Sequence, residues 1–204
     1  MLLHQIKMPV QKRSIERLEK VIDTTISMLE TQSIEQCSIQ EISTLSGVPR
    51  NYIYQYFPTI NHLFSLIVSR YFIKLRAYLV SDPKHYQGWL LLDIIEDILV
   101  RACQFYNTHK GASTLILGGP VNIDGFSLQE MVIDQISEDA TTMLNLVDSN
   151  FALQNQQHNI TLMIELIFAL MKRSFYHHGT ITMEMQKEIV LVCDAYLDKK
   201  NISF

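Results

Sequence analysis

The stretch SIQEISTLSGVPRNYIYQYFPTINHLF, residues 38–64, decides the fold of this chain. Within it, Tyr52–Tyr56 alternates tyrosine with other residues, as a half-buried β-strand would. The flanking signals indicate a helix instead. Gly47 is typical of the position just past a helix C-terminus, and Pro49 is typical of the first turn of the next helix. Because Pro58 ends this segment, the alternation is too short to outweigh the caps, and we predict a short helix.

Ser38 opens the helix before the turn, since Ser followed three residues later by Glu is a capping-box signature. Inside the short helix, Ile53 and Phe57 are four residues apart and share a buried face. Apolar residues at steps of three and four predict a first helix over residues 12–31 and a fourth from Thr59 to about residue 80.

The rest of the chain also has helical periodicity, and we predict an all-α protein. The scarcity of Gly (seven) and Pro (five) disfavours a strand-and-turn fold. Further helices are expected over residues 86–107, 109–117, 126–150, 160–178 and 182–199. The loop at Ser81–Pro83 suggests the domain division: residues 1–58, a connecting fourth helix over 59–80, and a larger helical domain over 81–204.

Composition excludes several classes of protein. No apolar run reaches the roughly 20 clean residues that a membrane span requires. The N-terminus has no apolar core followed by a cleavage site, so no signal peptide is expected. Cys37, Cys103 and Cys193 are far apart and lack CxxC spacing, which argues against disulfides and a zinc site. A reducing, cytoplasmic location is expected.

The net charge of −4 conceals an asymmetry along the chain. Residues 1–76 carry nine Lys and Arg against six Asp and Glu, whereas residues 77–204 carry eight against fifteen. A basic N-terminal third on an acidic remainder is typical of a DNA-contacting end on a non-contacting body, although chance variation in surface charge gives the same pattern.

The short helices and their turn form a candidate helix-turn-helix. A short helix that starts with Pro can enter a DNA major groove tip first. Its outward polar groups suit base edges, Arg50 suits guanine or phosphate, and the phenols suit phosphate oxygens, although packing is the commoner fate of helix aromatics. The expected DNA-binding residues are Ser38, Arg50, Asn51, Tyr52, Tyr54, Gln55 and Tyr56.

Residues 13–67 resemble the DNA-binding domain of the TetR family of bacterial transcriptional regulators. The resemblance is carried by a long first helix and by motifs in a fixed order and spacing. These motifs are Ser38…Glu41-Ile42, Gly47-Val48, Ile53-Tyr54-x-Tyr56-Phe57-Pro58 and Leu63-Phe64.

The resemblance implies a helical ligand-binding body whose last two helices, over residues 160–178 and 182–199, pair with a second subunit. It implies a homodimeric repressor that binds a palindromic operator and is released by a small-molecule effector. Two departures stand out: Ile60 occupies a position where the family usually has a Lys, and Asn51 and Tyr52 replace residues that are often small. The missing Lys suggests a weaker or relocated phosphate contact, offset by Arg50 or by the arm over residues 7–13.

An acidic body suggests cationic or amphipathic effectors. Glu165 lies within an apolar helix, where a charge is unfavourable unless it is paired or wetted, so it is a candidate pocket carboxylate. It equally fits an interface partner or an exposed helix edge. The expected ligand-binding residues are Asp93, Glu96, Asp97, Glu165 and Phe168, of which Asp97 also suits an i,i+4 pair with Arg101 and Phe168 equally fits the core.

No catalytic motif supports an enzyme: a phosphate-binding Gly loop after a strand, a GxSxG elbow and HExxH are all missing. We therefore expect no catalytic residue, no metal and no cofactor. The alternative to a DNA-binding repressor is a helical sensor or partner-binding protein that lacks specific DNA recognition, which Ile60 and the small basic excess favour.

Overall fold

The computed structural model describes residues 9–79, 81–118, 123–148, 151 and 156–203, and only the backbone of 123–128. These residues form helices and contain no strand, which confirms the predicted all-α class. Contacts divide the chain into two compact units: Met1–Ile73 with His109–Leu128, and Lys74–Thr108 with Gln129–Phe204. The predicted domain boundaries stay a prediction.

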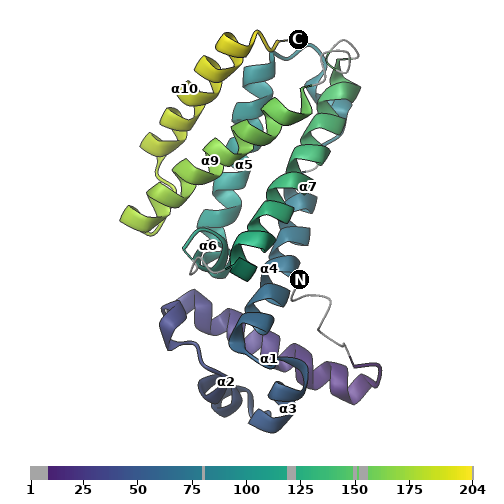
Figure 1. The fold of residues 1–204 in the computed structure, drawn as a ribbon, viewed down its shortest axis with the longest axis vertical. Helices are drawn as coiled ribbons and strands as arrows, with labels where there is room; N and C mark the ends of the chain where they lie inside the picture. The colour runs from purple at the N-terminus through teal and green to yellow at the C-terminus, as the bar shows by residue number, and fades with distance from the viewer. Residues whose placement is uncertain (1–8, 80, 119–122, 149–150, 152–155, 204) are drawn as a thin grey trace. The chain divides into compact units, whose positions relative to one another are not determined.

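The first unit begins with α1, Lys12–Thr31, as predicted (Figure 1). One face of this helix is fully buried because apolar residues recur at helical spacing, and a bidentate ion pair fixes the helix to α4, Ile60–Leu79. In that pair, the two terminal guanidinium nitrogens of Arg70 donate to the Glu19 carboxylate at 2.6 Å. The buried residues of α1 are Leu18, Val21, Ile22, Thr25, Met28 and Leu29.

The predicted helix-turn-helix is present. After a 3₁₀ turn at Ile34–Gln36 (η2) that was not predicted, α2 spans Ile39–Ser46, and the Ser38 hydroxyl accepts the Glu41 N–H at 3.1 Å. Gly47 ends α2 with φ of 67°, a left-handed conformation that glycine adopts without a Cβ clash. α3 then spans Arg50–Tyr56 with Pro49 at its N-cap.

The helix α6 completes the first unit. α6, Lys110–Ile116, packs against α1. The Gly111 N–H donates to Glu30 Oε1 at 3.0 Å, and Tyr71 Oη of α4 lies 3.5 Å from the same carboxylate oxygen. A Cβ at position 111 would lie 2.5 Å from Tyr71 Oη, so only glycine allows this approach.

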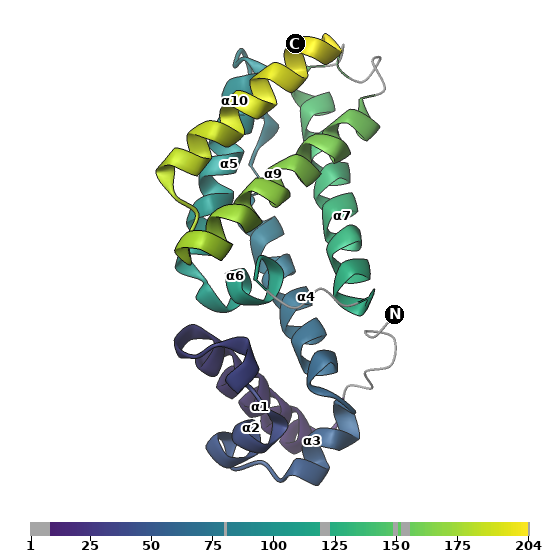
Figure 2. The ribbon, with the colours of Figure 1, turned by 60° about the vertical axis from the view of Figure 1, so that its left-hand side comes forward.

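The second unit is built from α5, Leu91–Thr108; α9, Gln157–His178; and α10, Met183–Lys200. It also contains the end of α4 and, from Gln129 onward, α7, Ile123–Val147. α10 packs against α5 and α9, and α9 and α10 run side by side in both views (Figure 1, Figure 2). Within this part of the fold, α9 and α10 lie within three residues of the predicted bounds.

The start of α5 differs from the prediction. The helix expected from Tyr86 begins at Leu91, because Pro83–Tyr86 instead forms a 3₁₀ turn (η3) closed by the Asp82 side chain, which accepts the Lys84 N–H at 3.0 Å. α7 likewise begins three residues before the predicted residue 126. The predicted ends at residues 80 and 150, and residues 7 and 8 of the predicted arm over residues 7–13, lie outside the described residues.

None of the described helices combines the length and the apolarity that a membrane crossing needs. The three cysteines are buried and unpaired. Among the described residues, no group of three His, Cys, Asp or Glu side chains is arranged to hold a metal ion.

Candidate nucleic-acid interface and ligand cavity

The recognition helix α3 has two chemically different faces. Ile53 is fully buried, whereas Tyr54, one residue further, leaves 49% of its surface exposed. Arg50, Asn51 and Gln55 are exposed as well, and they lie on the same face as Tyr54 because residues four apart stack along a helix. Apart from a 3.4 Å contact from Arg50 Nη1 to Gln40 Oε1, no hydrogen bond occupies these polar side-chain groups within the described residues. This face can therefore hydrogen-bond an external partner.

Tyr52 differs from its predicted outward orientation. Its hydroxyl donates to the Ser14 carbonyl of α1 at 3.0 Å, and the Arg17 guanidinium lies 5.5 Å from its ring centre. Tyr56 packs against it, with ring centroids 5.2 Å apart, and hydrogen bonding with Tyr52 raises the pKa of Tyr56. Tyr52 is thus better placed to hold α3 on α1 than to reach a base edge, while the protonated phenol of Tyr56 can still donate.

Ser38 is exposed at the N-cap of α2. Its oxygen accepts the Glu41 N–H, which leaves its own O–H as a donor to an external group. An anion beside it also meets the unpaired N–H groups and positive dipole end of α2. The geometry suits the predicted phosphate contact, which stays a prediction.

A group of cations on α1 was missed by the sequence analysis. Arg13, Arg17 and Lys20 are spaced four and three residues apart and are all exposed; we call them the basic stripe. Arg17 lies over the Tyr52 ring of α3, and Lys20 Nζ lies 3.9 Å from where a Cβ of Gly47 would be. None of the three forms an ion pair within the described residues. The helical spacing of the charges opposite Leu18 was the signal that could have found them.

Ile60, the unexpected residue, begins α4 and is half-buried. Next to it, Thr59 Oγ1 and His62 Nδ1 are 2.8 Å apart. The apolar side chain cannot donate to a phosphate, so any contact at this position requires another residue.

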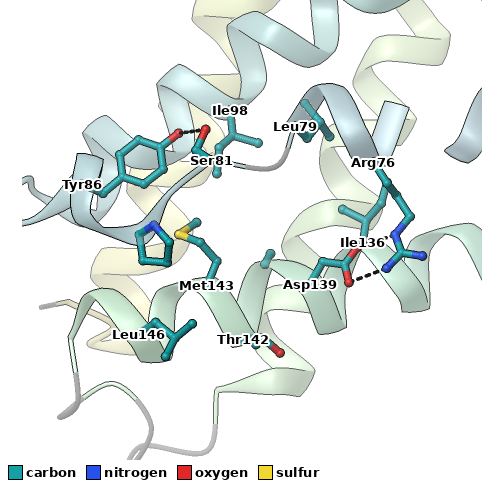
Figure 3. Close-up of a pocket in the computed structure, with 12 residues that line it drawn as sticks. Arg76, Leu79, Ser81, Tyr86, Ile98, Ile136, Asp139, Thr142, Met143 and Leu146 are labelled. Atoms are coloured by element: carbon teal, nitrogen blue, oxygen red, sulfur yellow. Dashed lines mark hydrogen bonds and ion pairs between the residues drawn. The ribbon is translucent and has the colours of Figure 1, made fainter. Parts of the chain in front are cut away.

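The second unit contains an open cavity of ≈ 310 Å³ between α4, η3, α5 and α7 (Figure 3). On one side of it, Arg76 and Asp139 form a bidentate ion pair at 2.6 and 2.8 Å, and this hydrogen bonding raises the pKa of Arg76. Opposite them lie Tyr86 and Ser81.

Tyr86 and Ser81 belong to a network around Arg101. The Tyr86 hydroxyl donates to Asp97 Oδ2 at 2.6 Å and accepts from Arg101, and Arg101 also donates to Ser81 Oγ at 2.8 Å and to the Leu79 carbonyl at 3.1 Å. Arg101 therefore caps the C-terminal end of α4. The predicted i,i+4 pair of Asp97 and Arg101 is confirmed at 3.0 Å.

A second cavity of ≈ 90 Å³ lies deeper in the same unit, between α4, α5, α7 and α9. Of the described residues that line it, Tyr106 alone carries a polar side-chain group, and Phe168 lies against the Tyr106 ring with centroids 6.3 Å apart. Sequence analysis missed Tyr106, because its position on the buried face of α5 looks like ordinary core.

The predicted ligand-binding residues are not gathered in one place. Phe168 lines the deeper cavity, whereas Asp93, Glu96 and Glu165 are exposed. Asp97 is engaged by Arg101 and Tyr86. None of the four carboxylates is among the described residues that line either cavity. Their role in ligand binding stays a prediction.

Comparisons with known proteins agree with this architecture. No protein-family model matches the chain. Solved structures that match the chain include a TetR-family transcriptional regulator from Streptomyces coelicolor, at 20% identity and a TM-score of 0.65 over 90% of this chain and 81% of that one. They also include a TetR transcriptional regulator from Rhodococcus sp. RHA1, at 17% identity and a TM-score of 0.61 over 91% of this chain and 97% of that one. The chain has the fold of these regulators, which confirms the predicted resemblance at the level of fold.

Two curated relatives are nucleoid occlusion factors named SlmA. The protein from Haemophilus ducreyi is 23% identical over 126 residues, and the protein from Glaesserella parasuis is 24% identical over 115 residues. The matches cover 61% and 55% of this chain, and they span 60% and 55% of the relatives' own length.

Proposed function

We propose that the chain is a transcriptional regulator of the TetR type, a homodimer that binds an operator in the cytoplasm and is released from it by a small molecule. The observation that carries this proposal is the exposed polar face of α3 beside the basic stripe of α1. Side chains that could reach base edges and side chains that could reach phosphates occur together in one compact unit.

The two kinds of contact divide by chemistry. Arg50, Asn51 and Gln55 carry the donors and acceptors that read base edges in a major groove about 12 Å wide. The phenols of Tyr54 and Tyr56, the Ser38 hydroxyl and the basic stripe suit phosphate oxygens, which fix position without reading sequence. We assign the basic stripe the phosphate contact that Ile60 cannot make.

Dimerisation through α9 and α10 is supported by their exposed apolar side chains. Tyr176 is 81% exposed, and Leu166, Met183 and Leu191 each expose more than two fifths of their surface. Two copies that cover these side chains would present two recognition helices to successive major grooves, about 34–36 Å apart on a palindrome. A monomer at micromolar concentration in a light-scattering measurement would contradict this part of the proposal.

Regulation requires that an effector prefer one conformation of the body. A complete reversal of the DNA-binding equilibrium, from 1:99 to 99:1, needs a preference of about 5.5 kcal/mol. The cavities of the second unit supply a place for such a molecule, because ligand sites are typically apolar cavities of roughly 300–1,000 Å³ with a few polar groups.

The test is salt-dependent binding to DNA from upstream of the gene itself. We expect fluorescence anisotropy to detect retention that weakens steeply as salt rises, because each neutralised phosphate releases counterions. A scrambled duplex of equal length is the control. Equal affinity for the two duplexes, or no binding at low salt, would remove the proposal's main support.

An alternative is a helical sensor or partner-binding protein without specific DNA recognition. The half-buried Ile60 in place of a Lys favours it. A variant with Arg50→Ala and Tyr54→Phe separates the two functions: a regulator loses DNA affinity and keeps ligand-induced thermal stabilisation, whereas a sensor loses neither.

The names of the two curated relatives favour a second DNA-linked candidate, a role in nucleoid occlusion. A chromosome-wide map of binding sites distinguishes it from local regulation. A regulator would occupy a few sites beside promoters, whereas a factor acting over the nucleoid would occupy many sites spread along the chromosome.

A further inference from the structure

One residue of the recognition helix, Tyr52, does not face outward. Its side chain is half-buried and turns back to α1, which lies beside α3 in Figure 1. The hydroxyl donates to the Ser14 carbonyl at 3.0 Å, across 38 residues of sequence. Because a phenol has a single proton, this hydroxyl cannot also donate to a base or a phosphate. Any contribution of Tyr52 to DNA binding must therefore act through another residue.

Two other side chains lie against the Tyr52 ring. The Arg17 guanidinium carbon is 5.5 Å from the ring centroid, within the roughly 6 Å over which a cation and an aromatic face attract each other. The Tyr56 ring is 5.2 Å away, centroid to centroid. Hydrogen bonding with Tyr52 raises the pKa of Tyr56, so the Tyr56 phenol stays protonated. The Tyr52 ring thus brings a cation of α1 close to a hydrogen-bond donor of α3.

Arg17 has the properties of an anion-binding side chain. It is exposed and forms no ion pair within the described residues. Of the two carboxylates nearest to it on α1, Glu19 is engaged by Arg70. Glu16 projects about 100° away around the helix, since successive residues are separated by that angle. Among the described residues, the Tyr52 ring is the group that holds the Arg17 guanidinium.

Holding the guanidinium in advance favours binding. An arginine loses side-chain freedom when it binds a phosphate, and this loss opposes association. A guanidinium that already lies against the Tyr52 ring has lost part of this freedom before DNA arrives, so its contact is preorganised. Such a contact matters in this chain because Ile60 cannot donate to a phosphate at the start of α4.

We propose that Tyr52 is a positioning residue for DNA binding, whose ring holds the Arg17 guanidinium near the Tyr56 phenol so that both groups bind one short stretch of phosphate backbone. The inference rests on the proposed function and deepens it, because it names the residue that orients one cation of the basic stripe. It gives Tyr52 an indirect role in place of the direct contact expected from the sequence. Lys20 of the basic stripe has no contact of this kind with Tyr52 within the described residues.

The test is a double-mutant cycle on the whole chain. Fluorescence anisotropy at several salt concentrations measures binding of the upstream duplex by Arg17→Ala, by Tyr52→Leu and by the double variant. Arg17→Ala should weaken binding by about tenfold for each bound copy, the value of one charge-assisted hydrogen bond, and should reduce the salt slope by about 0.9. In the Tyr52→Leu background the same substitution should weaken binding by less than about threefold, because the guanidinium is no longer held.

Two controls separate positioning from a general loss of structure. Lys20→Ala removes another cation of the basic stripe, and its effect should be the same with and without Tyr52→Leu. Tyr52→Phe keeps the ring, so Arg17→Ala should retain its full effect in that background. An Arg17→Ala effect that is equal in the unsubstituted and Tyr52→Leu chains, that shrinks together with the Lys20→Ala effect, or that disappears in Tyr52→Phe would overturn the proposal.

A measurement without DNA or substitution at position 52 tests the contact itself. Protons held over the face of an aromatic ring resonate upfield in NMR spectra. The side-chain protons of Arg17 should therefore resonate upfield of those of Arg13, which is exposed on the same helix. Equal shifts for the two arginines would overturn the proposal even if Tyr52→Leu failed to fold.

Failure of this inference is distinguishable from failure of the proposed function. Equal affinity for the upstream and scrambled duplexes, with an Arg17 effect that depends on Tyr52, would reject the regulator and support the positioning role. Sequence-specific binding with an Arg17 effect independent of Tyr52 would do the reverse. A chain that binds neither duplex at low salt would reject both.

Discussion

The recognition helix α3 separates packing from binding, whereas the deeper cavity combines them on the same side chains. In α3 the two tasks fall on opposite faces: Ile53 is fully buried, and Tyr54 beside it is half-exposed. In the second unit they fall on the same side chains, because Phe168 and its neighbours are both the core and the cavity wall. Substitutions on a surface that binds DNA can leave core packing unchanged, whereas substitutions in the wall of an apolar cavity cannot.

The difference has a physical origin. Phosphates and base edges are recognised by hydrogen bonds and charge, which an exposed side chain can supply. An apolar molecule is recognised by removal from water, which only a closed site can supply. We therefore expect substitutions on α3 to change binding alone, and substitutions around the cavity to change stability and binding together.

The largest effect is expected for Phe168→Ala. The side chain is 5% exposed and lines the cavity, so its removal enlarges an existing void, and the free energy of unfolding should fall by about 3–5 kcal/mol. Urea denaturation measures the loss. Ala169→Gly, at the exposed neighbouring position, is the control for a general perturbation of α9. It should lower the free energy of unfolding by about 1 kcal/mol. An unchanged free energy of unfolding in Phe168→Ala would show that the side chain is not part of the core.

The double substitution Arg50→Ala with Tyr54→Phe should act on binding alone. Operator affinity is expected to fall by roughly 2–4 kcal/mol, about 30- to 1,000-fold, because a base or phosphate contact and a phenol donor are lost. The free energy of unfolding should change by less than about 0.5 kcal/mol, since both side chains are exposed. Lys84→Ala with Tyr78→Phe is the matched control outside α3. A large loss of stability would show that α3 does not separate its two tasks.

Two hydroxyl deletions in the second unit should have different effects. Tyr86→Phe removes a hydroxyl that donates to Asp97 and accepts from Arg101, and unfolding should become easier by about 1–2 kcal/mol. Tyr106→Phe removes an unsatisfied hydroxyl, so stability without ligand should be unchanged or slightly higher. Paired urea denaturations measure both. A larger loss in Tyr106→Phe than in Tyr86→Phe would indicate a partner for the Tyr106 hydroxyl.

The smallest effect is expected at the partly exposed pair that joins α1 and α4. The hydrogen bonds from Arg70 lower the pKa of Glu19, so the stabilisation is complete above about pH 4.5 and is lost as the pH falls through the lowered value. Solvent screening limits it, and Glu19→Gln should reduce the free energy of unfolding at neutral pH by only about 0.5 kcal/mol. The difference from the unsubstituted chain should vanish once the pH falls below the lowered pKa of Glu19. Glu16→Gln, at an exposed position on α1, should show no such pH dependence.

The parts of the fold that the sequence predicted are those that local signals specify. The capped ends at Ser38, Gly47 and Pro49 fixed the helix-turn-helix to within a residue, because caps act over three or four positions. The start of α5 was predicted too early, at Tyr86, which is the last residue of the 3₁₀ turn Pro83–Tyr86 rather than the first of the helix.

The exposure of the candidate residues could be predicted where it depends on local helical period, and not where it depends on packing. Arg50, Asn51, Tyr54 and Gln55 follow from the period of one short helix. The inward turn of Tyr52 depends on Ser14, 38 residues away, which no local pattern contains. The same holds for Tyr106, whose missing partner is a property of four helices at once.

Gly111 has a consequence for how this chain can change. The Tyr71 hydroxyl occupies the place of a side chain at position 111, so the two positions constrain each other across 40 residues of sequence. We expect saturation mutagenesis at position 111 to return only glycine, with Gly111→Ala lowering the melting temperature. In a Tyr71→Phe background the nearest ring carbon lies 3.3 Å away, which is tight but tolerable, and part of the loss should be recovered. A smaller loss of melting temperature in the double variant than in Gly111→Ala alone would show that the residues at positions 71 and 111 can change only together.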